Sequence, residues 1–139
     1  MDFYSKANMK ISVIGTGYVG LSTATVFAEL GNDVLAADID KEKIDGLNKG
    51  VMPIFEPGLK ELVVRNVKEK RLRFTHDNKE VIDHGEIIFI CVGTPPKVTG
   101  ETELKYVEAV AKDIAENISS YKVIVHKSTV PVETGEKVK

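Results

Sequence analysis

The stretch GTGYVG at residues 15–20 decides how this sequence of 139 residues is interpreted. The pattern G-x-G-x-x-G is weak evidence by itself, because many unrelated turns match it. It gains weight where a strand runs into the glycines, a helix leaves them, and an acidic residue follows about twenty residues later. The sequence on either side of the glycines must supply these features.

All three features are present. The segment KISVI (10–14) is short and rich in β-branched residues, and it runs directly into the glycines. Apolar residues then recur at helical spacing, namely Leu21, Ala24, Phe27 and Ala28. Gly31 stands where a helix would end, and DVLAAD (33–38) reads as the next strand. Asp38 closes that strand, so the acidic residue follows the glycines at the required distance.

Further along the chain, strands and helices continue to alternate. Three more strands are predicted at 72–75, 86–92 and 122–127, and helices at 40–50, 57–67, 104–118 and after Pro131. The first, fourth and fifth strands are nearly all apolar, as central strands are, whereas the third alternates as an edge strand does. This pattern predicts an α/β fold, a Rossmann-type doubly wound parallel sheet of order 3-2-1-4-5.

We expect the sheet to stop before or within its sixth unit. The expected domain organisation is an N-terminal extension at residues 1–9 followed by one dinucleotide-binding domain at 10–139.

Composition excludes several classes of function. With 42% hydrophobic and 29% charged residues the chain reads as soluble and globular, and a net charge of −2 provides no basic field for nucleic acid. No apolar run approaches the roughly 18 residues that a membrane span needs. The single cysteine, Cys91, permits no intrachain disulfide, and the three histidines lack metal-ligand spacing. We expect a cytoplasmic protein with no nucleic-acid, membrane or metal partner.

The glycines and Asp38 predict a dinucleotide site. Gly15 permits a tight turn, Gly17 lets the backbone approach a pyrophosphate, and Gly20 lets the helix pack closely on the sheet. The N–H groups at the start of the helix then face the phosphates. Asp38 would accept the ribose hydroxyls and repel a 2′-phosphate, so NAD is favoured over NADP. Lys43 could reach the adenosine, although its spacing alone favours a solvated lysine.

Two more loops border the predicted crevice between strands 1 and 4. The loop VGTPP (92–96) follows strand 4, and we expect Val92, Gly93 and Thr94 to contact the cofactor. The loop KSTVP (127–131) follows strand 5. Its Ser128 and Thr129 either line the same crevice or cap the helix that Pro131 opens, and spacing does not decide between these.

Taken together, these segments resemble a known family. MKISVIGTGYVGL, AADIDKEKIDGLNKG, PIFEPGL, FICVGTPP and HKSTVPVETG occur in the order typical of the N-terminal NAD-binding domain of the UDP-glucose/GDP-mannose dehydrogenases. The resemblance runs from about Met9 to Lys139. It implies an NAD-dependent oxidoreductase of nucleotide-sugar metabolism and polysaccharide biosynthesis. Such an enzyme oxidises the C6 alcohol of UDP-glucose, or of a related UDP- or GDP-sugar, to the uronic acid with two NAD, through an enzyme-bound thioester.

The resemblance also implies roles for single residues. Tyr18 and Val19 would line the pyrophosphate turn. Asp38 would hold the adenosine ribose, with Lys43 beside it. Thr129 would lie near the nicotinamide and help to place a catalytic water, which makes it the one catalytic residue expected in this chain.

Other parts of the family's machinery have no counterpart here. The nucleophilic cysteine, in a stretch ending Ser-Cys-Phe-Pro-Lys-Asp, is missing, as are the residues that bind the sugar. Cys91 falls inside an apolar strand, where we expect a buried, unreactive thiol. We therefore expect the chain to be inactive alone. The nucleotide sugar would bind through an absent C-terminal half of a homo-oligomeric enzyme.

Two other readings stay open at this point. One is a non-catalytic NAD-sensing regulatory module, and the other is a dehydrogenase of the 3-hydroxyacid or 6-phosphogluconate type. The regulatory module shares the first glycine loop and the acidic residue, but it leaves the EPGL segment at 56–59 and the KSTVP segment at 127–131 unexplained. The second type of dehydrogenase shares the early half of the Rossmann fold.

Overall fold

Five parallel strands form a single sheet in the computed structural model, which describes residues 8–131 and 134–137. The strands are β1 (Lys10–Ile14), β2 (Asp33–Ala37), β3 (Leu72–Thr75), β4 (Ile87–Ile90) and β5 (Val123–His126). Their order is β3-β2-β1-β4-β5, and each neighbouring pair is parallel. The predicted doubly wound sheet is thereby confirmed. Residues 1–7 of the expected N-terminal extension lie outside the described residues.

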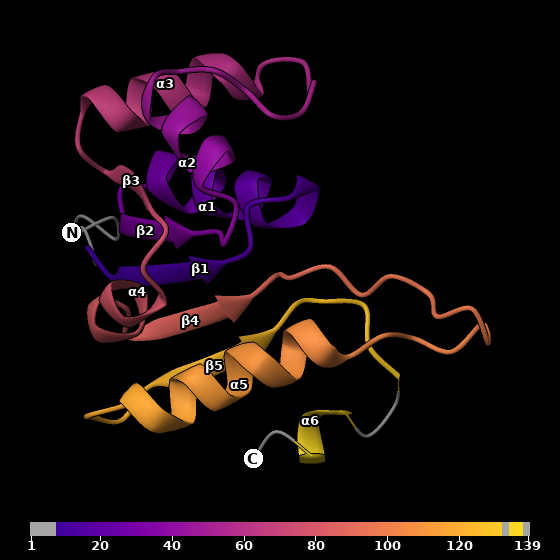
Figure 1. Ribbon diagram of the computed structural model, residues 1–139. Helices are drawn as coiled ribbons and strands as arrows, with labels where there is room; N and C mark the ends of the chain where they lie inside the picture. Colours follow the sequence, from indigo (N-terminus) through magenta and orange to yellow (C-terminus); the bar gives the residue numbers. More distant parts are fainter. Residues whose placement is uncertain (1–7, 132–133, 138–139) are drawn as a thin grey trace.

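Helices cover both faces of this sheet (Figure 1). On one face lie α1 (Tyr18–Glu29), α2 (Lys41–Asn48) and α3 (Leu59–Lys68), and on the other lie α4 (Asn78–His84) and α5 (Lys105–Asn117). A short α6 (Thr134–Lys137) follows β5. Alternate residues of a strand enter opposite cores: in β2, Val34 and Ala36 pack with α1 and α3, whereas Leu35 and Ala37 pack with α4 and α5.

Helix α4 was not predicted from the sequence. It has only seven residues, of which Val81 and Ile82 are buried, and this is too short for an apolar stripe to repeat. Its start is nevertheless encoded locally, because the Asp77 carboxylate accepts a hydrogen bond of 2.9 Å from the Lys79 N–H. An equivalent bond from the Lys43 N–H to the Asp40 carboxylate, 3.1 Å long, begins α2.

Strand β5 is less buried than its apolar sequence suggests. It forms one edge of the described sheet, and Val123 is 43% exposed. Within the described residues no helix is both long and apolar enough to cross a membrane.

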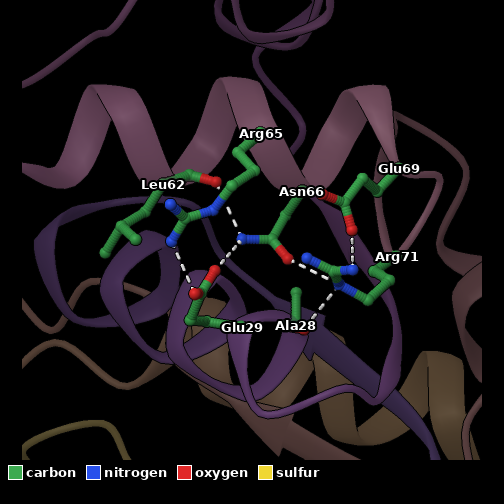
Figure 2. A network of polar contacts seen from close by, with 7 residues as sticks. All are labelled: Ala28, Glu29, Leu62, Arg65, Asn66, Glu69 and Arg71. Carbon is green, nitrogen blue, oxygen red and sulfur yellow. Dashed lines mark hydrogen bonds and ion pairs between the residues drawn. The ribbon is translucent and has the colours of Figure 1, made fainter.

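A polar network joins α1 to α3 and to the start of β3 (Figure 2). At its centre is Asn66, whose side-chain amide is fully buried. Its Nδ2 donates to the Glu29 carboxylate and to the Leu62 carbonyl, each over 2.8 Å, and its Oδ1 accepts from Arg71 Nε over 2.9 Å. All the polar atoms of this buried amide are therefore satisfied, as a buried side chain requires.

Candidate dinucleotide-binding site

A cavity of about 680 Å³ opens at the carboxyl edge of the sheet. It is bordered by the glycine turn after β1, the residues after β2, and the loops that follow β4 and β5. Helices α4 and α5 contribute its remaining wall. This is the place where a doubly wound sheet binds ligands, because the connections from β1 and β4 leave toward opposite faces there.

The glycine turn is shaped by close backbone contacts. Gly15 has φ of +101°, and a Cβ atom at this position would lie 2.5 Å from the Cys91 carbonyl oxygen. A Cβ atom on Gly20 would lie 1.7 Å from the Gly15 carbonyl oxygen. A Cβ atom on Gly17 would meet no atom within 4 Å. Two of the glycines are thus required by packing, and the third leaves space at the cavity.

The first turn of α1 faces this space without a side-chain cap. Gly17 is the N-cap residue, no side chain bonds to the first N–H groups, and the first turn carries no acidic residue. Tyr18 and Val19 line the cavity beside it. An uncapped helix start with free N–H groups and its partial positive charge suits a phosphate. The chain therefore fits the pyrophosphate of a dinucleotide here.

Asp38 lies at the end of β2 with its carboxylate held in place by four donors. Its Oδ2 accepts from the Thr16 N–H, the Thr16 hydroxyl and Lys43 Nζ, each over 2.9 Å. Its Oδ1 accepts from the Asp40 N–H over 3.0 Å. The side chain is only 12% exposed. Within the described residues, Oδ1 accepts only this one bond from Asp40, so its second lone pair can still accept a donor.

These contacts keep Asp38 ionised. Burial acts to raise the pKa of the carboxyl group, but the hydrogen bonds from the Thr16 and Asp40 N–H groups, from Lys43 and from the Thr16 hydroxyl outweigh it. The net effect is a pKa lowered from the usual value near 3.8. Asp38 is therefore a carboxylate, and an acceptor only, at neutral pH.

The loops after β4 and β5 are tied to each other. The Thr94 hydroxyl donates to the Thr129 carbonyl over 2.7 Å, and the Ser128 hydroxyl donates to the Val92 carbonyl over 2.8 Å. All four residues line the cavity. Ser128 and Thr129 thus lie in the cavity wall, the first of the two positions that spacing left open.

Cys91 is buried at the end of β4, as expected, with 8% of its surface exposed. Burial raises the pKa of its thiol to about 11, and the charge of Lys127 offsets this only in part. The thiol is therefore protonated at neutral pH and is a poor nucleophile. Nor do three or more His, Cys, Asp or Glu side chains gather as a metal site anywhere in residues 8–131 and 134–137.

The structure brings nearly all the predicted cofactor-binding residues to this cavity. Those that line it are Gly15, Gly17, Tyr18, Val19, Asp38, Lys43, Val92, Gly93, Thr94 and Thr129. Gly20 does not line it and lies buried behind the turn, where it packs against Gly15.

Several residues of the site were not found from the sequence. Thr16, between the first two glycines, holds Asp38 through both its backbone and its hydroxyl. The cavity wall also contains Asn78 of α4, and Tyr106, Ala109, Val110 and Asp113 of α5. The apolar stripe of α5 predicted a helix after β4, but it did not indicate which polar residues of that helix face the crevice.

A family model agrees with this geometry. Residues 9–139 match the model described as the UDP-glucose/GDP-mannose dehydrogenase family, NAD binding domain. The chain is 57% identical over 129 residues to a UDP-glucose 6-dehydrogenase of Bacillus subtilis, and 50% identical over 131 residues to one of Rhizobium meliloti. These alignments cover 93% and 94% of this chain. They cover only 28% and 30% of the two relatives, so the chain spans about three tenths of their length.

Solved structures match to a similar extent. A ternary complex of GDP-mannose dehydrogenase from Pseudomonas aeruginosa superposes with a TM-score of 0.90 and 38% identity, over 94% of this chain and 30% of that one. A UDP-glucose dehydrogenase from Pyrobaculum islandicum gives a TM-score of 0.91 and 35% identity, over 97% of this chain and 32% of that one.

Proposed function

Because this chain belongs to the UDP-glucose/GDP-mannose dehydrogenase family and is its NAD-binding domain, we propose that it holds NAD for the oxidation of a nucleotide sugar. The proposed reaction converts the C6 alcohol of UDP-glucose, or of a related UDP- or GDP-sugar, to a carboxylate. When bound, two NAD⁺ in turn would supply the oxidising power, one for each of the two hydrides that leave the sugar. The residues of this chain bind and orient the dinucleotide.

The pyrophosphate is assigned to the turn at Gly15–Gly17 and the start of α1. The uncapped N–H groups of this helix and its dipole stabilise negative charge. The free space beside Gly17 lets phosphate oxygens come close to the backbone. Tyr18 and Val19 border this space.

The adenosine ribose is assigned to Asp38. One ribose hydroxyl can donate to the lone pair that remains on Oδ1. The second needs a position on Oδ2, which already accepts from the Thr16 N–H, the Thr16 hydroxyl and Lys43 Nζ, each over 2.9 Å. We therefore propose that Lys43 yields this position when the dinucleotide binds. A 2′-phosphate would meet the carboxylate instead, which favours NAD over NADP.

The nicotinamide end is assigned to the tied loops after β4 and β5. Within the described residues, the Thr129 hydroxyl makes no hydrogen bond, whereas its carbonyl is held by Thr94. The hydroxyl is thus available to hold a water, and the proposed catalytic role of Thr129 is to place this water beside the reacting carbon. Thr94 and Ser128 fix the position of that backbone.

The remaining partners follow from the same proposal. The nucleotide sugar would be bound by residues other than those of this chain. The nucleophilic cysteine would also be a residue other than Cys91, because Cys91 is buried and the pKa of its thiol is raised. We also propose that the enzyme to which this domain belongs is a homo-oligomer of the cytoplasm. The one free cysteine suits a reducing compartment.

The observation that carries the proposal is that the Asp38 carboxylate and the uncapped start of α1 open into one cavity. Titration calorimetry should give a Kd for NAD⁺ of roughly 10 μM to 1 mM, equivalent to about −7 to −4 kcal/mol. In Asp38→Asn this affinity should fall about tenfold to a hundredfold, because charge-assisted bonds to the ribose are lost. Affinity for NADP⁺ should fall much less or rise.

Asp45→Asn is the matched control. Asp45 is an exposed carboxylate of α2 that does not line the cavity, so it removes the same charge without touching the site. Equal losses for NAD⁺ and NADP⁺ in Asp38→Asn would contradict the ribose assignment. An absence of saturation at several millimolar NAD⁺ in the wild-type chain would contradict the site as a whole.

The oxidation is tested separately, in a protein that joins this domain to the sugar-binding part of the family. Such a protein should form two NADH for each uronic acid produced from UDP-glucose. One NADH for each product, or an aldehyde as the end product, would contradict the proposed four-electron reaction.

A further inference from the structure

The cavity extends beyond Asp38 to a wall that the pyrophosphate and ribose do not use. This wall is made by Ile39, which follows β2, and by residues of α4 and α5. Ala109 and Val110 of α5 are apolar. Its polar side chains are Asn78 at the start of α4 and, on α5, Tyr106 and Asp113.

This end of the cavity is next to the ribose position. The Asp38 N–H donates to the Thr75 carbonyl at the end of β3, and Asn78 follows only three residues after Thr75. The opposite end of the cavity is formed by Thr94 and Thr129, in the loops that follow β4 and β5. A base attached to the ribose that Asp38 holds can therefore reach the wall of α4 and α5, which cover the same face of the sheet (Figure 1).

Asn78 and Asp113 form one unit there. Asn78 Nδ2 donates to Asp113 Oδ2 over 2.9 Å, across 35 residues of sequence. Both side chains are partly buried. Within the described residues, no other side chain bonds to Asp113 Oδ1 or to Asn78 Oδ1. The pair thus presents carboxylate and amide acceptors, with one N–H of the Asn78 amide still unused.

We propose that Asn78 and Asp113 recognise the adenine base of the dinucleotide and discriminate it from bases that carry a 6-oxo group. Adenine offers an N6 amino donor between ring-nitrogen acceptors. The Asp113 carboxylate accepts from the amino group, and the free Asn78 N–H donates to a ring nitrogen. Hypoxanthine places an oxygen where adenine has the amino group, so two acceptors would face each other. This inference rests on the proposed function, because it requires the ribose to lie on Asp38.

The test compares NAD⁺ with nicotinamide hypoxanthine dinucleotide, whose base carries a 6-oxo group and a protonated N1 where adenine has a 6-amino group and an unprotonated N1. By titration calorimetry the wild-type chain should bind NAD⁺ roughly tenfold to a hundredfold more tightly, since a matched pair of base contacts discriminates by that order. Asp113→Asn should bring the two affinities to within about threefold, because an amide can donate to the 6-oxo group. The side-chain amide signal of Asn78 should shift on addition of NAD⁺ in an NMR titration.

Glu116→Gln serves as the control for charge. It removes one negative charge from α5 at a largely exposed position that does not line the cavity, so the preference for NAD⁺ should stay as in wild type. Equal binding of the two dinucleotides by the wild type would overturn the base recognition while leaving the proposed function intact. So would an unchanged ratio in Asp113→Asn. Failure of the wild type to bind either dinucleotide would overturn both.

Discussion

At the scale of single residues, the three glycines of the turn have different tasks. Gly15 and Gly20 are needed because the backbone passes within van der Waals contact, at 2.5 Å and 1.7 Å from where their Cβ atoms would stand. Gly17 is needed for another reason. It has φ of −73°, which any residue adopts, and a Cβ atom there would meet no protein atom within 4 Å but would enter the cavity. Within the six residues 15–20, two glycines are therefore needed for folding and one for binding.

This separation leads to a prediction. Gly17→Ala should reduce NAD⁺ affinity at least tenfold, because the methyl group occupies the space of a phosphate. It should lower the free energy of unfolding by no more than about 1 kcal/mol, because Ala is a poorer N-cap residue than Gly. Gly20→Ala should instead destabilise the fold by about 2–3 kcal/mol or more through overpacking. Urea unfolding and calorimetry on both variants measure the two effects.

The opposite pattern would contradict this assignment of the glycines. If Gly17→Ala unfolded more easily while binding NAD⁺ normally, the start of α1 would have no part in holding the phosphates.

At the scale of secondary-structure elements, α3 is fastened to α1 by polar contacts as well as by its apolar face. Val63 contributes to the apolar core, while the buried Asn66 amide bridges Glu29 and Arg71 (Figure 2). Since α1 carries the phosphate turn at its other end, this network braces the helix whose start forms the site. The carboxyl group of Glu29 has a lowered pKa, first because of the Asn66 hydrogen bond and then because of Arg65.

Removing the bridge should cost stability. Asn66→Ala leaves polar atoms of Glu29 and Arg71 without their partner, and we expect a loss of about 1–3 kcal/mol in the free energy of unfolding. Arg65→Ala is the control, because this half-exposed side chain forms an ion pair with the same carboxylate and should cost about 0–1 kcal/mol. Urea denaturation at pH 7 compares the two. A smaller loss in Asn66→Ala than in Arg65→Ala would contradict the central place of the amide.

The same network predicts an acid dependence. The pKa of Glu29 in the folded chain lies below its usual value of 4.5, so its contribution is present above that pH and is lost as pH falls through the folded pKa. Stability of the wild type should therefore decline as pH drops below about 4.5. The decline should be shallower in Asn66→Ala, where the main cause of the lowered pKa is absent. Equal slopes would contradict this coupling.

At the scale of the whole molecule, the strand order brings distant segments to one edge. The glycine turn, the end of β2, and the loops after β4 and β5 meet there because parallel strands all end on the same side of the sheet. A dinucleotide that spans these segments contacts both halves of the domain. Its binding should therefore stabilise the fold as a unit.

This stabilisation is measurable. At a hundred times its Kd, NAD⁺ should stabilise the folded chain by about 2.7 kcal/mol. For a domain of this size, the melting temperature should rise by roughly 5–15 °C. NADP⁺ at the same concentration should give a smaller rise, because its 2′-phosphate meets Asp38. The same rise with both cofactors, or none with either, would contradict a preformed NAD site.

The sequence by itself determined the fold and the location of the dinucleotide site. The alternation of apolar strands with amphipathic helices gave the sheet order, and GTGYVG with Asp38 indicated where a dinucleotide binds. These features are readable because they depend on local constraints. A glycine is demanded by the turn itself, and an apolar strand by burial on both faces of a parallel sheet. The family resemblance rests on GTGYVG and the segment around Asp38 together with the EPGL, VGTPP and KSTVP loops.

Only the tertiary structure decided which side chains act together. Thr16 and Asp38 are 22 residues apart, and Thr94 and Thr129 are 35 apart, yet each pair shares a hydrogen bond. Such pairs depend on strand register and on the angle of each helix over the sheet, which no local pattern encodes. The same holds for Asn78 of the unpredicted α4 and for Asp113. Their position over the cavity follows from the packing of two helices on one face of the sheet.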